Sequence, residues 1–137
     1  MGEVRVKTKI TNAADEALAR RGQIAAADVR TYEADALVDT GAVSSVLPVH
    51  VVMQLGLMSR GKRVAQYADG RHDTVDVTES VIFQIIGRDT SEEALVIGDE
   101  VLIGQTVLEK LDLLVDCNNN KVIPNPAHPD QPVLKVK

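Results

Sequence analysis

Apolar residues alternate with polar or charged ones along two stretches of this chain, residues 4–10 and 29–38. Because successive side chains of a strand point to opposite faces, each stretch predicts a β-strand with one face toward solvent. Shorter apolar runs follow, separated by turn signals such as Asp69-Gly70 and the three asparagines from Asn118. They occupy residues 63–67, 75–86, 94–97, 100–103, 113–115 and 121–123. The pattern predicts a mainly β, sandwich-like or barrel-like domain of about eight to ten short strands.

Two or three short helices are expected between these strands. Asn12 can cap a helical turn over residues 13–18, and Pro48 can begin a helix that stops at Gly56. A third helix of about two turns is expected over residues 105–111, because Leu108 and Leu111 fit one face. The whole chain, 1–137, is interpreted as one domain. Its parts are an N-terminal strand and short helix (1–28), a core (29–123), and a proline-rich tail with a final strand at 133–136 (124–137).

Composition limits both the core and the function. The chain has two Tyr, one Phe and no Trp, so the core should be aliphatic. The net charge of -5 and the shortage of stacking rings argue against a nucleic-acid partner. No apolar stretch is long enough for a membrane span and no signal peptide is evident, so a soluble, cytoplasmic protein is expected.

Metal and cofactor sites are not predicted. The three histidines share no metal-ligand spacing, and the acids from Asp69 to Glu79 lack the spacing of a calcium loop. The single cysteine, Cys117, cannot form an internal disulfide and indicates a reducing compartment.

The motif of greatest chemical interest is Leu37-Val38-Asp39-Thr40-Gly41-Ala42, in which a strand runs directly into a turn that carries an acid. A bare Asp-Thr-Gly arises by chance in roughly one chain in twenty of this composition. The flanking apolar pair and the small residue lower that to about one in a thousand. Without a function, the motif would be an Asp-initiated turn between two strands.

A second segment, Val101-Leu102-Ile103-Gly104, places three apolar residues and a glycine before the expected helix at 105–111. Alone it would be a buried strand that ends in a turn. The order and spacing of the two segments make residues 29–122 resemble a retroviral-type aspartic protease, a retropepsin. In this resemblance, Asp39 to Ala42 match the catalytic loop, Ala68-Asp69-Gly70 lie at the tip of the flap hairpin, and Leu102-Ile103-Gly104 form the second, substrate-pocket loop.

The resemblance implies a closed barrel of short strands with one lobe per chain, acting as an aspartic endopeptidase on a peptide or protein substrate. Asp39 would be catalytic, Thr40 would hold two loops together, and Gly41 and Ala42 would leave room for water and substrate. The mechanism needs two aspartates, and this chain has one Asp-Thr-Gly. The resemblance therefore implies a homodimer with one Asp39 from each chain, and the alternating terminal segments are candidates for its interface.

Two alternatives stay open at this point. The same dimeric fold could be a non-catalytic module that binds a peptide or a partner, or the domain could be an unrelated monomeric β fold. The expected flap tip carries Asp69, Arg71 and Asp73, whereas that of viral enzymes is rich in glycine. Val43, Ser44 and Ser45 replace the acids that follow the viral catalytic loop.

Overall fold

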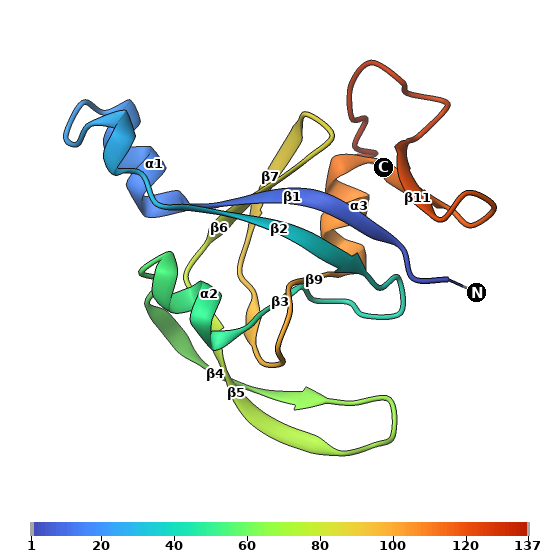
Figure 1. Cartoon of the computed structure of the whole chain (residues 1–137), viewed down its shortest axis with the longest axis horizontal. Helices are drawn as coiled ribbons and strands as arrows, with labels where there is room; N and C mark the ends of the chain where they lie inside the picture. Colours follow the sequence, from blue (N-terminus) through green and yellow to red (C-terminus); the bar gives the residue numbers. More distant parts are fainter. Residues whose placement is uncertain (1, 137) are drawn as a thin grey trace.

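The computed structural model describes residues 2–136 as a mainly β fold with three short α-helices, as predicted (Figure 1). No helix in this range is long and apolar enough to span a bilayer. The helices are α1 (Ala13–Arg20), α2 (Val49–Gln54) and α3 (Gln105–Leu111), with a 3-10 turn, η1, at Ala26–Asp28. The strands are β1 (Arg5–Asn12), β2 (Thr31–Val38), β3 (Val46–Leu47), β4 (Ser59–Gln66), β5 (His72–Thr78), β6 (Val81–Ile85), β7 (Arg88–Glu92), β8 (Leu95–Val96), β9 (Leu102–Ile103), β10 (Leu113–Asp116) and β11 (Lys121–Pro124).

Nine strands form one curled sheet in the order β4-β5-β8-β3-β9-β2-β1-β6-β7, and β10 and β11 form a separate hairpin. The end strands β4 and β7 do not pair with each other, so the sheet is curled into a half-barrel. Helix α3 packs against β7, while the β4–β5 hairpin projects from the other end of the sheet (Figure 1).

The core is aliphatic, as the composition predicted. Phe83 is its only aromatic residue among the fully buried side chains, and it lies among branched aliphatic ones. Members of this core come from both halves of the chain and include Ile10, Leu47, Val51, Leu55, Val81, Ile85, Ile103, Val107 and Leu111. Burial of this apolar surface is the main favourable term that holds the strands together.

The N-terminal strand lies inside the sheet. β1 pairs with β2 over residues 5–11 on one side and with β6 over residues 9–12 on the other, so β6 covers only the second half of its other edge. As expected, Asn12 caps the helix that follows, because its Oδ1 accepts a hydrogen bond from the Asp15 N–H at 3.1 Å. That the N-terminal segment contributes to a dimer interface stays a prediction.

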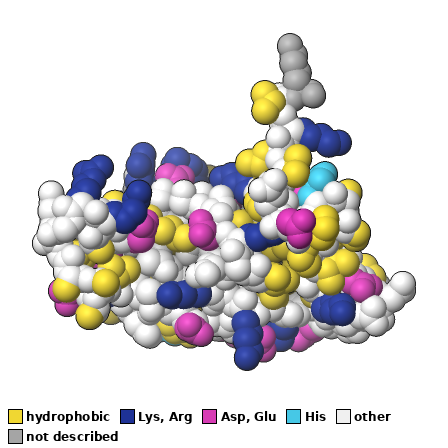
Figure 2. All heavy atoms as spheres, turned by 90° about the horizontal axis from the view of Figure 1, so that it is seen from above, with side chains coloured by type: hydrophobic (Ala, Val, Ile, Leu, Met, Phe, Trp, Pro, Cys, Tyr) yellow, Lys and Arg dark blue, Asp and Glu magenta, His cyan; other side chains and the backbone are white. Residues whose placement is uncertain are grey.

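Two segments differ from the predicted strands. The run at 75–86 is two strands, β5 and β6, and the chain reverses again at Ile86 and Gly87, whose φ angles of 53° and 73° suit a tight hairpin turn into β7. Residues 133–136 alternate in polarity but form no strand, because no sheet edge pairs with them. This tail projects from the body of the molecule (Figure 2), and Val136 is 96% exposed.

Candidate active site

Asp39 follows the last residue of β2 directly. The end of β2 pairs in parallel with β9, with Leu37 opposite Leu102 and Val38 opposite Ile103. One residue further on, the Asp39 N–H donates to the Ile103 carbonyl at 3.0 Å. Both strands are apolar here and stop together, so Asp39 and Gly104 come to the same edge of the sheet.

The loop after β2 orients its own carboxylate. Asp39 Oδ1 accepts a hydrogen bond from the Gly41 N–H at 2.9 Å, and the Ala42 N–H donates to the Asp39 carbonyl at 3.1 Å. A Cβ at position 41 would lie 3.2 Å from Asp39 Oδ1, so glycine leaves the carboxylate this space. Asp39 and Thr40 are both exposed in the single chain. The Asp39 side chain is therefore accessible to water or to another molecule.

The first residues of α3 hold this loop through hydrogen bonds. The Gln105 N–H donates to the Ala42 carbonyl at 2.7 Å, and the Val43 carbonyl accepts from the Thr106 N–H at 3.2 Å and from Thr106 Oγ1 at 3.0 Å. These bonds use donors that the first turn of a helix leaves free. They fix the loop at two successive carbonyls.

Gly104 and Ser45 lock the two segments together. A Cβ on Gly104 would lie 2.6 Å from both the carbonyl carbon and the oxygen of Ser44, so only glycine allows this backbone contact. The Gly104 N–H donates to Ser45 Oγ at 2.9 Å, and Ser45 is fully buried. Sequence reasoning singled out Gly104 but missed this role of Ser45, which had no signal beyond a serine between apolar residues.

A cleft with a cavity volume of about 780 Å³ opens beside the loop. Of the residues predicted for the site, Asp39, Gly41, Ala42, Ala68 and Leu102 line it. Thr40, Asp69, Gly70, Ile103 and Gly104 do not; Ile103 is buried in the core instead. The remaining lining residues are Leu37, Val43, Ser44, Val46, Val64, Ala65, Gln66, Tyr67, Leu95, Ile97, Gly98, Asp99 and Glu100.

The β4–β5 hairpin forms one wall of the cleft through residues from the end of β4 and the start of its turn. Side chains at the turn hold one another: Tyr67 Oη donates to Asp73 Oδ2 at 3.1 Å, and the Arg71 guanidinium lies 4.9 Å from the Tyr67 ring centroid. Arg71 also pairs with Asp69 at 2.7 Å. Desolvation and the bond to Asp73 raise the pKa of the Tyr67 hydroxyl. The charged tip is thus internally paired, and Tyr67 and Ala68 face the cleft.

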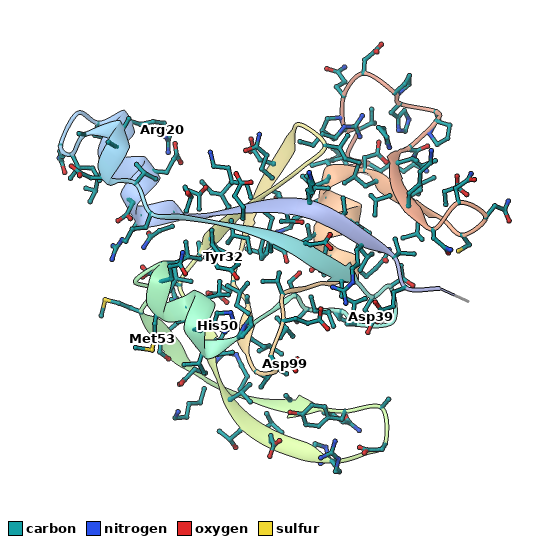
Figure 3. The ribbon with its side chains drawn as sticks, in the orientation of Figure 1. Arg20, Tyr32, Asp39, His50, Met53 and Asp99 are labelled. Atoms are coloured by element: carbon teal, nitrogen blue, oxygen red, sulfur yellow. The ribbon has the colours of Figure 1, made fainter. Side chains whose placement is uncertain are left out.

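The cleft carries acidic but no basic side chains. Asp39, Asp99 and Glu100 are its ionisable lining groups apart from Tyr67 (Figure 3). Glu100 Oε1 lies 2.7 Å from Arg5 Nη1, so its charge is balanced from the N-terminal strand. Within residues 2–136, no group of three or more His, Cys, Asp or Glu side chains is arranged to hold a metal ion. The site therefore consists of the exposed Asp39 carboxylate, the cleft beside it and the β4–β5 hairpin that faces it.

Comparison with known proteins gives structural but no sequence matches. No family model and no curated protein matches the chain. Among solved structures, the solution structure of simian foamy virus (mac) protease is similar with a TM-score of 0.48 and 16% identity, over 76% of this chain and 90% of that one. A foamy viral protease-reverse transcriptase in complex with an RNA/DNA hybrid is similar with a TM-score of 0.45 and 19% identity, over 56% of this chain. The chain spans only 10% of the length of that second protein.

Proposed function

We propose that the chain is a retropepsin-like aspartic endopeptidase that acts as a homodimer, with one Asp39 from each copy in the catalytic pair. The observation that carries this proposal is the position of Asp39. It is held by the Gly41 N–H and by β9, it is exposed, and it lies in a cleft whose facing wall is the β4–β5 hairpin. The exposure of Asp39 and Thr40 in one chain is consistent with a second copy that completes the site.

In the proposed reaction, the two Asp39 carboxyl groups share one proton, because carboxylates about 3 Å apart cannot both ionise. The ionised group takes a proton from water, and the water oxygen attacks the peptide carbonyl carbon. The protonated group donates a hydrogen bond to the carbonyl oxygen and stabilises the charge that develops there. Transfer of a proton to the amide nitrogen then allows the C–N bond to break, giving a carboxyl and an amino product.

The rest of the site has supporting roles in this proposal. The Gly41 N–H fixes the rotamer of Asp39, and the contact between Gly104 and Ser44 fixes the loop, so little reorganisation is needed for reaction. The β4–β5 hairpin would cover an extended peptide and exclude water. Ala42, Val46 and Leu102 give the cleft aliphatic walls.

Replacement of Asp39 tests the proposal directly. Asp39→Asn keeps the size of the side chain but cannot take a proton from water, so we expect peptide cleavage to fall at least about a thousandfold. The measurement is digestion of a peptide library between pH 3 and 7, with and without a transition-state-mimicking inhibitor of aspartic proteases. Asp35→Asn is the matched control, because Asp35 lies exposed on β2, the strand that leads to Asp39, and does not line the cleft.

Retention of peptidase activity by Asp39→Asn would exclude this mechanism. Loss of activity in Asp39→Asn has to occur with unchanged folding, which circular dichroism and the unfolding midpoint report. Activity that falls equally in Asp35→Asn would point to a general loss of structure rather than to chemistry at Asp39.

A further inference from the structure

One rim of the cleft combines an apolar wall with a carboxylate. Leu95 and Ile97 line the wall, and the chain then bends through Gly98 to Asp99, which lines the same cleft (Figure 3). Gly98 has a φ of 77°, a conformation that glycine adopts readily, and its Cα carries no side chain beside Val46. The bend therefore holds the Asp99 carboxylate at the edge of an aliphatic surface.

Asp99 has no charge partner, in contrast to the residue that follows it in the chain. The neighbouring Glu100 is paired with Arg5 at 2.7 Å. Asp99 makes no hydrogen bond or ion pair with any part of the chain that the structure describes. On the facing hairpin, Arg71 is paired with Asp69 at 2.7 Å and Lys62 with Asp76 at 2.9 Å. Arg63 on the same hairpin donates to the Lys62 carbonyl and does not line the cleft. Among the residues that the structure describes, no basic side chain lines the cleft, so the charge of Asp99 is left for a ligand.

We propose that Asp99 selects a Lys or Arg side chain of the extended peptide that the cleft binds. This inference rests on the proposed function and adds its substrate class. A Lys or Arg side chain fits both the apolar wall and the carboxylate. Its aliphatic stem can pack on Leu95 and Ile97 while its cation reaches Asp99. An apolar side chain would fill the wall but leave Asp99 partly desolvated without a partner, and an acidic side chain would be repelled.

Cleavage of matched peptides measures this selection. Peptides that carry Lys, Arg, Gln, Leu or Glu at one position, with that position moved along the sequence in turn, are compared by kcat/KM. At one subsite we expect the basic residue to be favoured over Gln by about tenfold, the effect of one charge-assisted hydrogen bond. Asp99→Asn should reduce this preference to about twofold or less, and Asp99→Lys should shift it toward Glu.

The matched control is Asp28→Asn, which removes the same charge from an exposed residue of η1 outside the cleft. It should keep the full preference for basic residues, which separates a local effect of Asp99 from the net charge of the protein. Added salt should weaken the preference in the wild type and leave Asp99→Asn nearly unchanged, because salt screens exposed charge pairs.

A binding measurement distinguishes failure of this inference from failure of the proposed function. The same peptides, labelled with a fluorophore, are titrated against Asp39→Asn and against Asp39→Asn combined with Asp99→Asn, and anisotropy is recorded. Preference for basic peptides in the first protein and its loss in the second supports the role of Asp99 even without turnover. Cleavage without a basic preference, a preference that survives Asp99→Asn, or no preferential binding of basic peptides overturns the inference.

Discussion

At the scale of single residues, two small residues determine where the loop that carries Asp39 lies. Gly104 brings its Cα against the Ser44 carbonyl, and its N–H is satisfied by the buried Ser45 hydroxyl. A buried N–H without a partner costs about 1–3 kcal/mol, so the serine contributes by removing that cost. The loop that carries Asp39 is thus positioned by Gly104 and Ser45, neither of which lines the cleft.

Gly104→Ala tests this packing. The new Cβ would lie 2.6 Å from two backbone atoms of Ser44, so the backbone has to move. The φ of Gly104 is -90°, which alanine adopts without strain, so steric overlap is the only cost. We expect a loss of about 1–3 kcal/mol in the free energy of unfolding, measured by urea denaturation.

Ser44→Ala is the control for this experiment, because it changes the exposed side chain and leaves the contacted backbone in place. Its unfolding free energy should stay within about 0.5 kcal/mol of the wild type. A stability of Gly104→Ala equal to that of Ser44→Ala would show that the loop adapts freely and that the contact does not position Asp39.

At the scale of elements, periodicity in the sequence predicted the strands that have partners in the chain. β1, β2 and the β4–β5 and β10–β11 hairpins fall close to the alternating runs, because half-buried strands need this pattern. It did not separate β6 from β5, since both are apolar on alternate positions and only Gly87 marked a reversal further on. It also predicted a strand at 133–136, because polarity cannot show whether a sheet edge is available.

The candidate site was predictable to a similar extent. The motif indicated Asp39, Gly41 and Ala42, which line one cleft, and the turn signal at Asp69-Gly70 located the facing hairpin. Asp99 and Tyr67 were not singled out, because their place in the cleft depends on how β8, β9 and the hairpin approach in space. Local patterns carry no information on such long-range contacts.

A cluster at the end of α3 holds the chain that leads to the tail. Asp112 accepts hydrogen bonds from Asn125 Nδ2 at 3.0 Å and from the Val133 N–H at 3.0 Å, and His128 Nδ1 lies 2.6 Å from its Oδ2. Arg88 donates to the Leu111, Asp112 and His128 carbonyls. The Asp112 carboxylate and the Arg88 guanidinium therefore join β7, the end of α3 and the segment after β11.

This cluster gives a prediction for pH. The bond from Asn125, with those from Val133 and His128, lowers the pKa of Asp112 from 3.8 to about 2. Because the folded state holds the proton less tightly than the unfolded state, Asp112 stabilises the fold fully above about pH 4, and this stabilisation is lost as the pH falls to about 2. Asp112→Asn should lower Tm at pH 6, and the difference from the wild type should shrink toward pH 2.

Asparagine is the suitable replacement because Asp112 has a left-handed φ of 55°, which asparagine tolerates. The control is Asp130→Asn, which removes an exposed carboxylate of the tail. Thermal unfolding followed by circular dichroism at several pH values gives the comparison. A constant Tm difference between wild type and Asp112→Asn from pH 6 to pH 2 would contradict the assigned role.

At the scale of the whole molecule, one short chain offers half of the proposed catalytic machinery. The proposed homodimer needs a contact that brings a second copy close to Asp39, which is exposed at the end of β2. The tail is one candidate for that contact, since Val133, Leu134 and Val136 are exposed and their backbone pairs with no strand of the same chain. These features fit an enzyme whose site is completed by association.

Mixing wild-type and Asp39→Asn chains tests this shared site. If each catalytic pair needs Asp39 from both copies, a mixed dimer holds one aspartate and is inactive. Equal amounts that are unfolded and refolded together should then retain about one quarter of the activity of the same total amount of wild type, because random pairing leaves one fully wild-type dimer in four. A site contained in one chain would instead retain about one half. The mass in solution, measured on the same mixture by light scattering, has to be that of a dimer; a monomer that retains one half of the activity would exclude the shared pair and require both catalytic groups within a single chain.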